Sequence, residues 1–599
     1  MRSAALLRHR RFGAFFWTQF LGALNDNVFR NALVILFAFG AAATRLTPDV
    51  LVNLASGVFV LPFFLFSATA GQLADKVEKT RIIRMVKLFE IAIMAFAALG
   101  FALESASLLL VALFLMGTHS AFFGPVKFSI LPQHLRDEEL VAGNALVEMG
   151  TFVAILLGTV LGGVLVAIAG IGPAVASAAT IGLAVAGWAA SRWIPPAPAA
   201  DPGLRIRWNP VVETWRLLGF ARAVRGVWVS ILGISWFWCY GTLLLAQFPG
   251  LGRDLLGGDA HVVTLLLSVF SIGVGVGCML CERLSGDVVE LGLVPLGALG
   301  LTVFALDLAH AAPLAGAAGG VDVAGFAASP RHWRLALDLA ALGASGGLFI
   351  VPLLAFVQQQ SDAAHRSRVI AANNVVNALA MVVAAILGIA LRTGGVTIPR
   401  LLVLTAVLNA AVALSIFAAV PEFFLRLVIW LLVHTVRRVE RRGLEHLPRH
   451  GAAVVVSNHV GVVDALLIAS VSPRPVRFVL DHAVFRIPIL GCVFRAGRAI
   501  PLASREHEPV LLERAHDEIA AALAAGELVC IFPEGRLTTA GAARILARTP
   551  VPVVPLALRR RSRGVWSRTE VVFGPPLAPA EATVEAVHAR VLALRDERR

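Results

Sequence analysis

The chain has 599 residues, of which 58% are hydrophobic and 15% are charged, and its mean hydropathy is +0.80. A soluble domain is about 45–50% apolar and about 25% charged, and a disordered chain has low hydrophobicity, so this composition excludes both classes. The formal net charge is +14. We attribute it to basic residues on the cytoplasmic face of a membrane protein, and not to nucleic-acid binding.

Long apolar runs recur from residue 12 to residue 422, whereas residues 443–599 have the mixed polarity of a soluble domain. A membrane-spanning helix needs about 20 mostly apolar residues. Twelve stretches meet this requirement, centred near residues 28, 62, 93, 118, 155, 182, 238, 272, 300, 345, 380 and 410. The polar connection 196–224 is the longest and separates two six-helix halves, 1–195 and 225–422. We therefore expect an α-helical polytopic membrane protein followed by a cytoplasmic α/β domain.

Lysine and arginine residues near the helix ends predict the orientation, because they accumulate on the cytoplasmic side. If the N-terminus is cytoplasmic, that side receives the N-terminal arginines, the basic residues of 76–87 and the arginines of the connection 196–224. The resulting bias is roughly threefold. We expect a multi-pass protein of the bacterial inner membrane with both termini in the cytoplasm.

Two segments of the chain resemble each other, residues 123–145 and residues 350–374. Each begins with a proline-containing turn of helix and continues into an Ala-x-Asn sequence, in the fourth and fifth predicted helices of its half. A parallel duplication of six-helix halves is how one large transporter architecture is built.

The segment after the second predicted helix combines a glycine, an aspartate and several cations, in the order Gly71-Gln72-Leu73-Ala74-Asp75-Lys76-Val77-Glu78-Lys79-Thr80-Arg81. A glycine here allows close helix contact, and an aspartate near a helix end can hold one state of a rocking transporter. The segment resembles the helix 2–3 loop signature of the major facilitator superfamily, through Gly71, Asp75, Lys79 and Arg81. The resemblance implies a twelve-helix transporter.

Ionisable residues inside membrane helices are costly, so they are functional candidates by default. The sharpest cases are Asp26 and Lys127, followed by Glu148. Lys127 can hold an anionic group of a substrate, and Asp26 can gate the pathway or hold an amine, with hydrogen bonds from Asn25 and Asn27. The alternative is a structural ion pair or a position that faces a loop.

Segments around these residues are similar to bacterial lysophospholipid transporters of the same superfamily. They are Phe20-Leu21-Gly22-Ala23-Leu24-Asn25-Asp26-Asn27, Gly124-Pro125-Val126-Lys127-Phe128 and Asn144-Ala145-Leu146-Val147-Glu148. The resemblance adds Asn144 to the candidate transport residues. It implies that lysophospholipid is flipped from the outer to the inner leaflet.

Residues 423–435 are apolar but too few to span a membrane, and four arginines follow within residues 437–442. An apolar stretch with a basic end is suited to the membrane interface. We therefore predict an interfacial amphipathic linker helix over residues 423–442. A thirteenth crossing would place the last domain, 443–599, on the opposite side of the membrane.

Residues 451–456 form a short β-branched run typical of a buried strand, and Asn458, His459 and Asp464 follow it in an N-H-x4-D pattern. An imidazole whose pKa lies near the working pH can take a proton from a lipid hydroxyl. A carboxylate near a helix start can reach the other ring nitrogen and fix the tautomer. We predict His459 as the general base and Asp464 as the residue that orients it.

A second strand end carries Phe532-Pro533-Glu534-Gly535-Arg536. The glycine lets the backbone approach a phosphate, and the arginine can bind it through a bidentate fork. With Gly497-Arg498-Ala499-Ile500-Pro501-Leu502 and Val551-Pro552-Val553-Val554-Pro555-Leu556, these motifs resemble the glycerolipid acyltransferase family. The resemblance implies a phosphate site of Glu534, Gly535, Arg536 and Arg498. It also implies no metal or bound cofactor, and acyl-ACP or acyl-CoA as the acyl donor.

The leading prediction is a bifunctional protein that flips a lysophospholipid and re-acylates it from an acyl thioester. Its partners are lysophospholipid, membrane lipid, and acyl carrier protein or acyl-CoA. The segment between Gly541 and Val551 is shorter than in the acyltransferase family, so two alternatives stay open. One is a lysophosphatidic acid acyltransferase fused to a transporter of another substrate. The other is a transporter with a non-catalytic regulatory domain.

Overall fold

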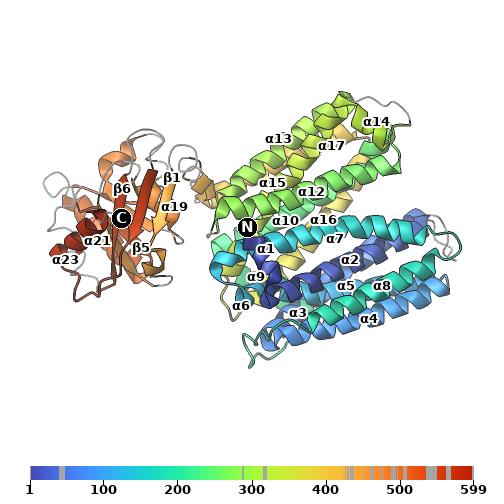
Figure 1. The fold of residues 1–599 in the computed structure, drawn as a ribbon, viewed down its shortest axis with the longest axis horizontal. Helices are drawn as coiled ribbons and strands as arrows, with labels where there is room; N and C mark the ends of the chain where they lie inside the picture. Colours follow the sequence, from blue (N-terminus) through green and yellow to red (C-terminus); the bar gives the residue numbers. More distant parts are fainter. Residues whose placement is uncertain are drawn as a thin grey trace. The chain divides into compact units, whose positions relative to one another are not determined.

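A computed structural model describes all residues except 1, 39–47, 287–288, 315–319, 422, 425, 428, 430, 432–437, 449–450, 459–463, 473, 475, 488–490, 492–493, 496, 504–508, 534–549, 561–567 and 597–599. The chain divides into two units, Met1–Ala419 and Val420–Arg599, and each is described by itself. The first is a bundle of long helices, and the second is built on a β-sheet (Figure 1).

Each predicted membrane-spanning segment has its centre in a long helix. The first half contains α2 (Arg10–Ala38), α3 (Pro48–Lys76), α4 (Lys79–Ala102), α5 (Ala106–Ser129), α7 (Leu140–Val166) and α8 (Gly172–Ser191). The second half contains α10 (Arg225–Leu245), α12 (Ala260–Ser285), α13 (Leu293–Leu314), α15 (Pro330–Gln360), α16 (Arg366–Thr393) and α17 (Ile398–Ala419).

Ten helical segments of the described residues are long and apolar enough to cross a membrane. The other two predicted segments, α2 and α4, are 29 and 24 residues long and contain Asp26 and the pair Lys87 and Glu90. The helical unit agrees with the predicted fold class, and the count of twelve crossings stays a prediction.

The internal repeat occupies equivalent places in the two halves. Pro125 lies inside α5 and Pro352 lies inside α15, and each of these helices is followed by the helix that carries the repeated asparagine, α7 or α16. This arrangement agrees with a duplication of six-helix halves.

Glycines let α12 and α15 approach each other closely. A Cβ atom added at Gly277 of α12 would overlap the carbonyl oxygen of Ala344, and one added at Gly347 of α15 would lie 2.5 Å from the backbone nitrogen of Cys278. Small residues permit this contact in a membrane, where hydrophobic burial does not drive helices together.

The predicted polar connection 196–224 contains a helix that the sequence analysis did not predict, α9 (Pro210–Ala223). The Asn209 side chain accepts hydrogen bonds from the backbone nitrogens of Val211 and Val212 at 3.1 and 3.2 Å, and Pro210 begins the helix. Both residue types favour a helix start. Shorter helices of this unit are α1 (Arg2–Arg8), α6 (Leu131–His134), η1 (Asp137–Glu139), α11 (Phe248–Gly250), η2 (Leu251–Leu255) and α14 (Val323–Ala328).

The second unit contains a seven-stranded sheet with the order β1-β7-β6-β2-β5-β3-β4. Its strands are β1 (Arg438–Arg442), β2 (Ala453–Ser457), β3 (Val476–Asp481), β4 (Ile500–Leu502), β5 (Leu528–Ile531), β6 (Val553–Arg560) and β7 (Arg568–Phe573). Neighbouring strands are parallel except for the antiparallel pair β6 and β7. The short helices η3 (Leu444–His446) and η4 (His482–Arg486) follow β1 and β3.

Helices cover both faces of this sheet. Val455 of β2 packs in one apolar cluster with residues of α19 (Asp464–Val471), whereas Val454 and Val456 pack in another with residues of α21 (Pro509–Ala524) and α23 (Val584–Asp596). Because side chains alternate along a strand, the two clusters lie on opposite faces. This layered α/β arrangement agrees with the predicted fold class of the C-terminal domain.

The predicted linker helix over residues 423–442 is wrong at its C-terminal end. The described residues between 421 and 431 are helical, but Arg438–Arg442 form β1. This strand pairs in parallel with β7, from Arg438 opposite Arg568 to Arg442 opposite Val572. Its basic sequence suited a helix at a lipid interface, but backbone pairing with a strand far along the chain decides the conformation.

Candidate functional site

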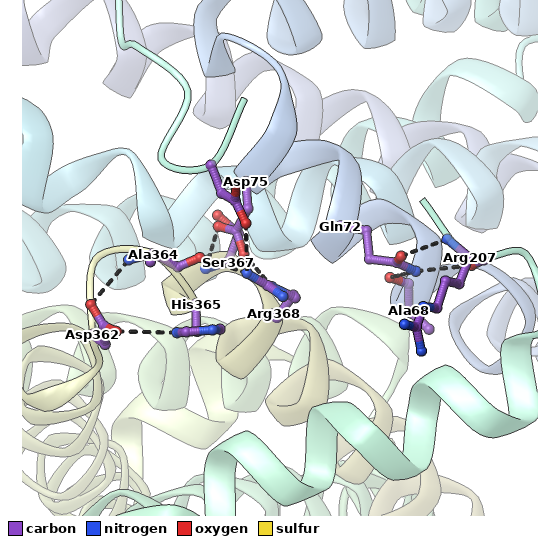
Figure 2. A network of polar contacts seen from close by, with 10 residues as sticks. Ala68, Gln72, Asp75, Arg207, Asp362, Ala364, His365, Ser367 and Arg368 are labelled. Carbon is purple, nitrogen blue, oxygen red and sulfur yellow. Dashed lines mark hydrogen bonds and ion pairs between the residues drawn. The ribbon is translucent and has the colours of Figure 1, made fainter. Parts of the chain in front are cut away.

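Asp75, near the end of α3, joins the two halves of the helical unit. Its carboxylate is fully buried and accepts hydrogen bonds from the backbone nitrogen of Ser367 at 3.1 Å and from Nε of Arg368 at 2.9 Å (Figure 2). Both partners belong to the first turn of α16, where free backbone N–H groups and the helix dipole favour an anion. The aspartate of the loop motif therefore closes this end of the bundle.

Gly71 lies one turn before Asp75 and lets α3 approach α16. A Cβ atom at Gly71 would be 2.7 Å from Cβ of Ala371 and 3.2 Å from the carbonyl oxygen of Ser367. Of the two cations in the motif, Lys79 begins α4 and is buried, whereas Arg81 is exposed.

Residues other than the four that match the motif also hold this end closed. The Gln72 side chain exchanges two hydrogen bonds with the backbone of Arg207, at 2.9 and 3.0 Å, which ties the central connection to α3 (Figure 2). The ring of Phe220 in α9 lies against His365, with centroids 4.6 Å apart and planes tilted by 30°, and the guanidinium of Arg368 lies 5.1 Å from the Phe220 ring centre.

The loop between α15 and α16 carries its own local network. Asp362 accepts a hydrogen bond from the backbone nitrogen of Ala364 at 3.2 Å and lies 3.1 Å from Nδ1 of His365. The backbone bond first, and the histidine second, lower the pKa of the Asp362 carboxyl. An ionised Asp362 holds the loop that leads into the first turn of α16.

Asn144 of α7 also bridges the two halves. Its amide exchanges hydrogen bonds of 2.7 and 2.9 Å with the amide of Gln358 in α15, and both side chains are buried. This predicted transport residue therefore belongs to the contact between the halves, apart from the residues around Asp26.

Asp26 and Lys127 are half-buried in the first half of the bundle. Ser120 donates a hydrogen bond to Oδ2 of Asp26 at 3.0 Å, and Nζ of Lys127 donates to Oγ1 of Thr151 at 2.9 Å. Oδ1 of Asp26 and Oε2 of the buried Glu148 have no hydrogen-bond partner among the described residues. Since buried polar atoms without partners are costly, these atoms retain capacity for a ligand.

The neighbouring asparagines have different surroundings. The Asn27 amide donates to the carbonyl oxygen of Ala23 in its own helix at 2.8 Å. The Asn25 amide is buried and donates to Oε1 of Glu90 in α4 at 2.7 Å. Asn25 therefore faces a second charged group, which the sequence analysis missed.

Lys87, Glu90 and His119 form that group. The predicted orientation places Lys87 among the basic residues at the cytoplasmic ends of the helices. In the structure, Lys87 is fully buried on α4, with its Nζ 2.7 Å from Oε2 of Glu90. A lysine and a glutamate three residues apart lie on one face of a helix, so their position within an apolar run was a signal for this pair. His119 of α5, whose Nε2 lies 3.3 Å from the same oxygen, had no comparable signal.

In the second unit, the two predicted motifs follow neighbouring strands. β2 and β5 are adjacent and parallel, with Val456 opposite Ile531. The residues that follow both strands are therefore at the same edge of the sheet, where α/β proteins bind their ligands. The predicted residues His459, Glu534, Gly535 and Arg536 lie outside the described residues.

Described residues anchor both sides of this edge. Asn458, directly before the predicted base, is buried and exchanges hydrogen bonds of 2.7 and 3.1 Å with the backbone of Leu558 in β6. Asp464 is buried and is the first residue of α19, the helix start that the H-x4-D pattern predicts. Asn458 is a positioning residue to which the sequence analysis assigned no role.

Arg498 lies away from this edge. It adopts a left-handed backbone conformation with φ 53°, its side chain is 63% exposed, and its Nη1 is 3.5 Å from Oε1 of Glu527. Glu527 directly precedes β5, whereas the phosphate motif follows β5. The other predicted phosphate ligands lie outside the described residues, so the assignment of Arg498 to the phosphate site stays a prediction. Cys530, inside β5, is buried, and burial raises the pKa of its thiol, so it is no thiolate nucleophile.

Comparisons with known proteins agree with both predicted resemblances. The family model of the Major Facilitator Superfamily matches residues 15–385, and the model named Acyltransferase matches residues 438–559. The lysophospholipid transporter LplT of Salmonella heidelberg (strain SL476) is 30% identical over 358 residues, which cover 57% of this chain and 78% of that protein. LplT of Enterobacter sp. (strain 638) is 28% identical over 355 residues, with the same coverage.

Solved structures share the fold of the helical unit. The human organic anion transporter MFSD10 has a TM-score of 0.53 and 13% identity, over 68% of this chain and 99% of that one. A bacterial homologue of the iron transporter ferroportin, in an outward-facing state, has a TM-score of 0.51 and 13% identity over the same shares. At these identities the likeness concerns the fold alone.

Proposed function

This chain belongs to the Major Facilitator Superfamily and, within it, to the family of the lysophospholipid transporter LplT, and on this premise we propose that it flips a lysophospholipid from the outer to the inner leaflet and then re-acylates it. The observation that carries the proposal is the presence of both family matches in one polypeptide. A fused enzyme receives the flipped lipid at a high effective concentration.

The transport half of the proposal rests on the half-buried groups between α2, α5 and α7. A lysolipid phosphate binds the Lys127 ammonium, which has one hydroxyl partner among the described residues. An amine in the head group binds the unpartnered oxygen of Asp26. The contacts of Asp75 with α16 close the bundle at the end that we assign to the cytoplasm.

The enzymatic half of the proposal rests on the shared edge of β2 and β5. His459 takes the proton from the free glycerol hydroxyl, whose oxygen attacks the carbonyl carbon of an acyl thioester. The C–S bond then breaks, and the thiol of acyl carrier protein or CoA leaves with a proton. Asp464 orients the imidazole, and Gly535 and Arg536 hold the glycerophosphate. The buried Asn458 fixes the backbone directly before His459.

The test uses the full chain in proteoliposomes with both thioester donors. We expect acylation of lysophosphatidylethanolamine, its loss in His459→Ala, and its retention in His588→Ala, which removes an exposed histidine of α23. If the chain acylates only lysophosphatidic acid, the result would favour an acyltransferase for that lipid fused to a transporter of another substrate. If no lysolipid is acylated, the result would favour a transporter whose second domain is regulatory and not catalytic.

A further inference from the structure

The buried group of Lys87, Glu90, His119 and Asn25 has no part in the function proposed so far. Each of its four side chains is at most 2% exposed, so no lipid head group reaches it. By contrast, Asp26 and Lys127 are only half-buried. A fully buried ionisable group inside a membrane helix is costly and requires a reason.

Glu90 is the centre of this group. Its carboxylate lies 2.7 Å from the Asn25 amide nitrogen, 2.7 Å from Nζ of Lys87 and 3.3 Å from Nε2 of His119. The ammonium occupies the space that Gly22 leaves free, because a Cβ atom at Gly22 would overlap Nζ. Lys87 and Glu90 therefore neutralise each other, and His119 decides the net charge of the group.

His119 is unusually placed for a buried histidine. Neither ring nitrogen has a hydrogen-bond partner with good geometry among the described residues, although Nε2 lies within ion-pair distance of Glu90. Its ring stacks on Phe123, with centroids 6.2 Å apart. Histidine is the side chain whose charge ordinarily changes between pH 5 and 8. A protonated His119 ring can donate a hydrogen bond to Glu90 and attract its charge. A neutral ring interacts with the Glu90 carboxylate more weakly.

The charged groups near His119 come from three helices. Lys87 and Glu90 belong to α4, Asp26 to α2 and Lys127 to α5 itself. The helices α3 and α16 also pack on α5, but they carry their charged residues near their ends: Asp49, Asp75 and Lys76 in α3, and Arg366, Arg368 and Arg392 in α16. Arg30, one turn after Asp26, is exposed and lies over the Phe59 ring.

His119 and Asp26 are linked through their neighbours. His119 directly precedes Ser120, which donates to Asp26, and Asn25, which donates to Glu90, directly precedes Asp26. Electrostatic interactions join Asp26 to His119, Glu90 and Lys87. A positive charge at His119 and a positive charge bound at Asp26 therefore compete for the Asp26 carboxylate.

We propose that His119 is a proton-binding site, and that binding of a positively charged head-group amine at Asp26 expels this proton. In the absence of substrate, the imidazolium faces Glu90 and Asp26. When the amine binds Asp26, the proton leaves Nε2 for water, and the triad of Lys87, Glu90 and neutral His119 carries no net charge. This inference rests on the proposed lysophospholipid transport and adds a coupled proton to it.

The experiment measures lysolipid binding to the purified full chain between pH 5.5 and 7.5. By linkage, the affinity for lysophosphatidylethanolamine should increase with pH by up to about tenfold per pH unit, with release of up to one proton. Lysophosphatidylglycerol has no amine, so its binding should release none. His119→Gln should remove the pH dependence, and His261→Gln, at an exposed histidine of α12, should keep it.

Binding that is independent of pH in the unmodified chain, without proton release, overturns the inference and leaves the proposed function intact. Retained pH dependence in His119→Gln also overturns it, because another group, such as Asp26 itself, then carries the proton. If His119→Gln does not fold, His119→Asn takes its place in the same comparison. Failure to bind or flip any lysolipid overturns the proposed function, and this inference with it.

Discussion

The close approach of α3 and α16 at Gly71 predicts the effect of a single methyl group. A Cβ atom at Gly71 would be 2.7 Å from Cβ of Ala371, about 0.7 Å short of an ordinary contact. Overpacking of this kind costs about 1–3 kcal/mol. The cost falls on the state in which α3 and α16 touch, so Gly71→Ala should shift the equilibrium toward the state open at this end by about 5–150-fold.

The assay uses a cysteine at position 367, in the first turn of α16. Ser367 is fully buried and its hydroxyl has no hydrogen-bond partner among the described residues, so Ser367→Cys should leave the closed state undisturbed. A water-soluble maleimide should alkylate this thiol faster when Gly71→Ala is added, in proportion to the open fraction. Gly182→Ala in α8, where an added Cβ meets no atom within 4 Å, is the matched control. Equal alkylation rates in the two backgrounds would refute the steric argument.

Four further substitutions test the two sites. Asp26→Asn keeps the shape of the side chain and removes its charge. It should slow acylation in sealed vesicles that hold lysolipid in the leaflet opposite the enzyme, but not in detergent micelles. Equal vesicle rates for the variant and the unmodified chain would make Asp26 structural. Asn458→Ala leaves a buried backbone N–H of Leu558 without its partner, and should cost about 1–3 kcal/mol in urea unfolding and lower kcat; an unchanged kcat would remove its positioning role. Arg536→Lys should lower kcat/KM because a lysine cannot reproduce a bidentate contact, whereas Arg498→Lys should leave kcat/KM unchanged. A lower kcat/KM in Arg498→Lys, with an unchanged value in Arg536→Lys, would make Arg498 the phosphate ligand.

Much of the architecture was predictable from local sequence patterns. Apolar runs of spanning length are nearly independent of context, so every predicted centre lies in a long helix. The strands before His459 and Glu534 were also predictable, because β-branched runs bounded by polar motifs are typical of buried parallel strands. The adjacency of these two strands was not predictable from spacing, because strand order depends on packing along the whole domain.

Most of what the sequence analysis did not predict depends on contacts between residues far apart in the chain. Arg438–Arg442 resembled the basic end of an interfacial helix until its pairing with β7 was visible. Lys87 resembled a cation at the membrane surface, because its burial and the approach of His119 on α5 to its partner Glu90 are properties of the folded bundle. Arg498 matches a family motif and its role stays a prediction, but its ion pair with Glu527 depends on how β4 and β5 are placed in the sheet.

The strand β1 has a consequence for the order in which the protein is synthesised. β1 is the first strand of the second unit to leave the ribosome, and its partner β7 is the last. The sheet therefore cannot be completed until almost the whole chain has been made, and until then both edges of β1 are unpaired and other chains can bind them. Arg442 of β1 also lies 2.6 Å from the buried carboxylate of Glu570 in β7. A domain cut out at residue 443 would lack both the strand and this arginine, so a soluble form of the enzyme should begin before Arg438.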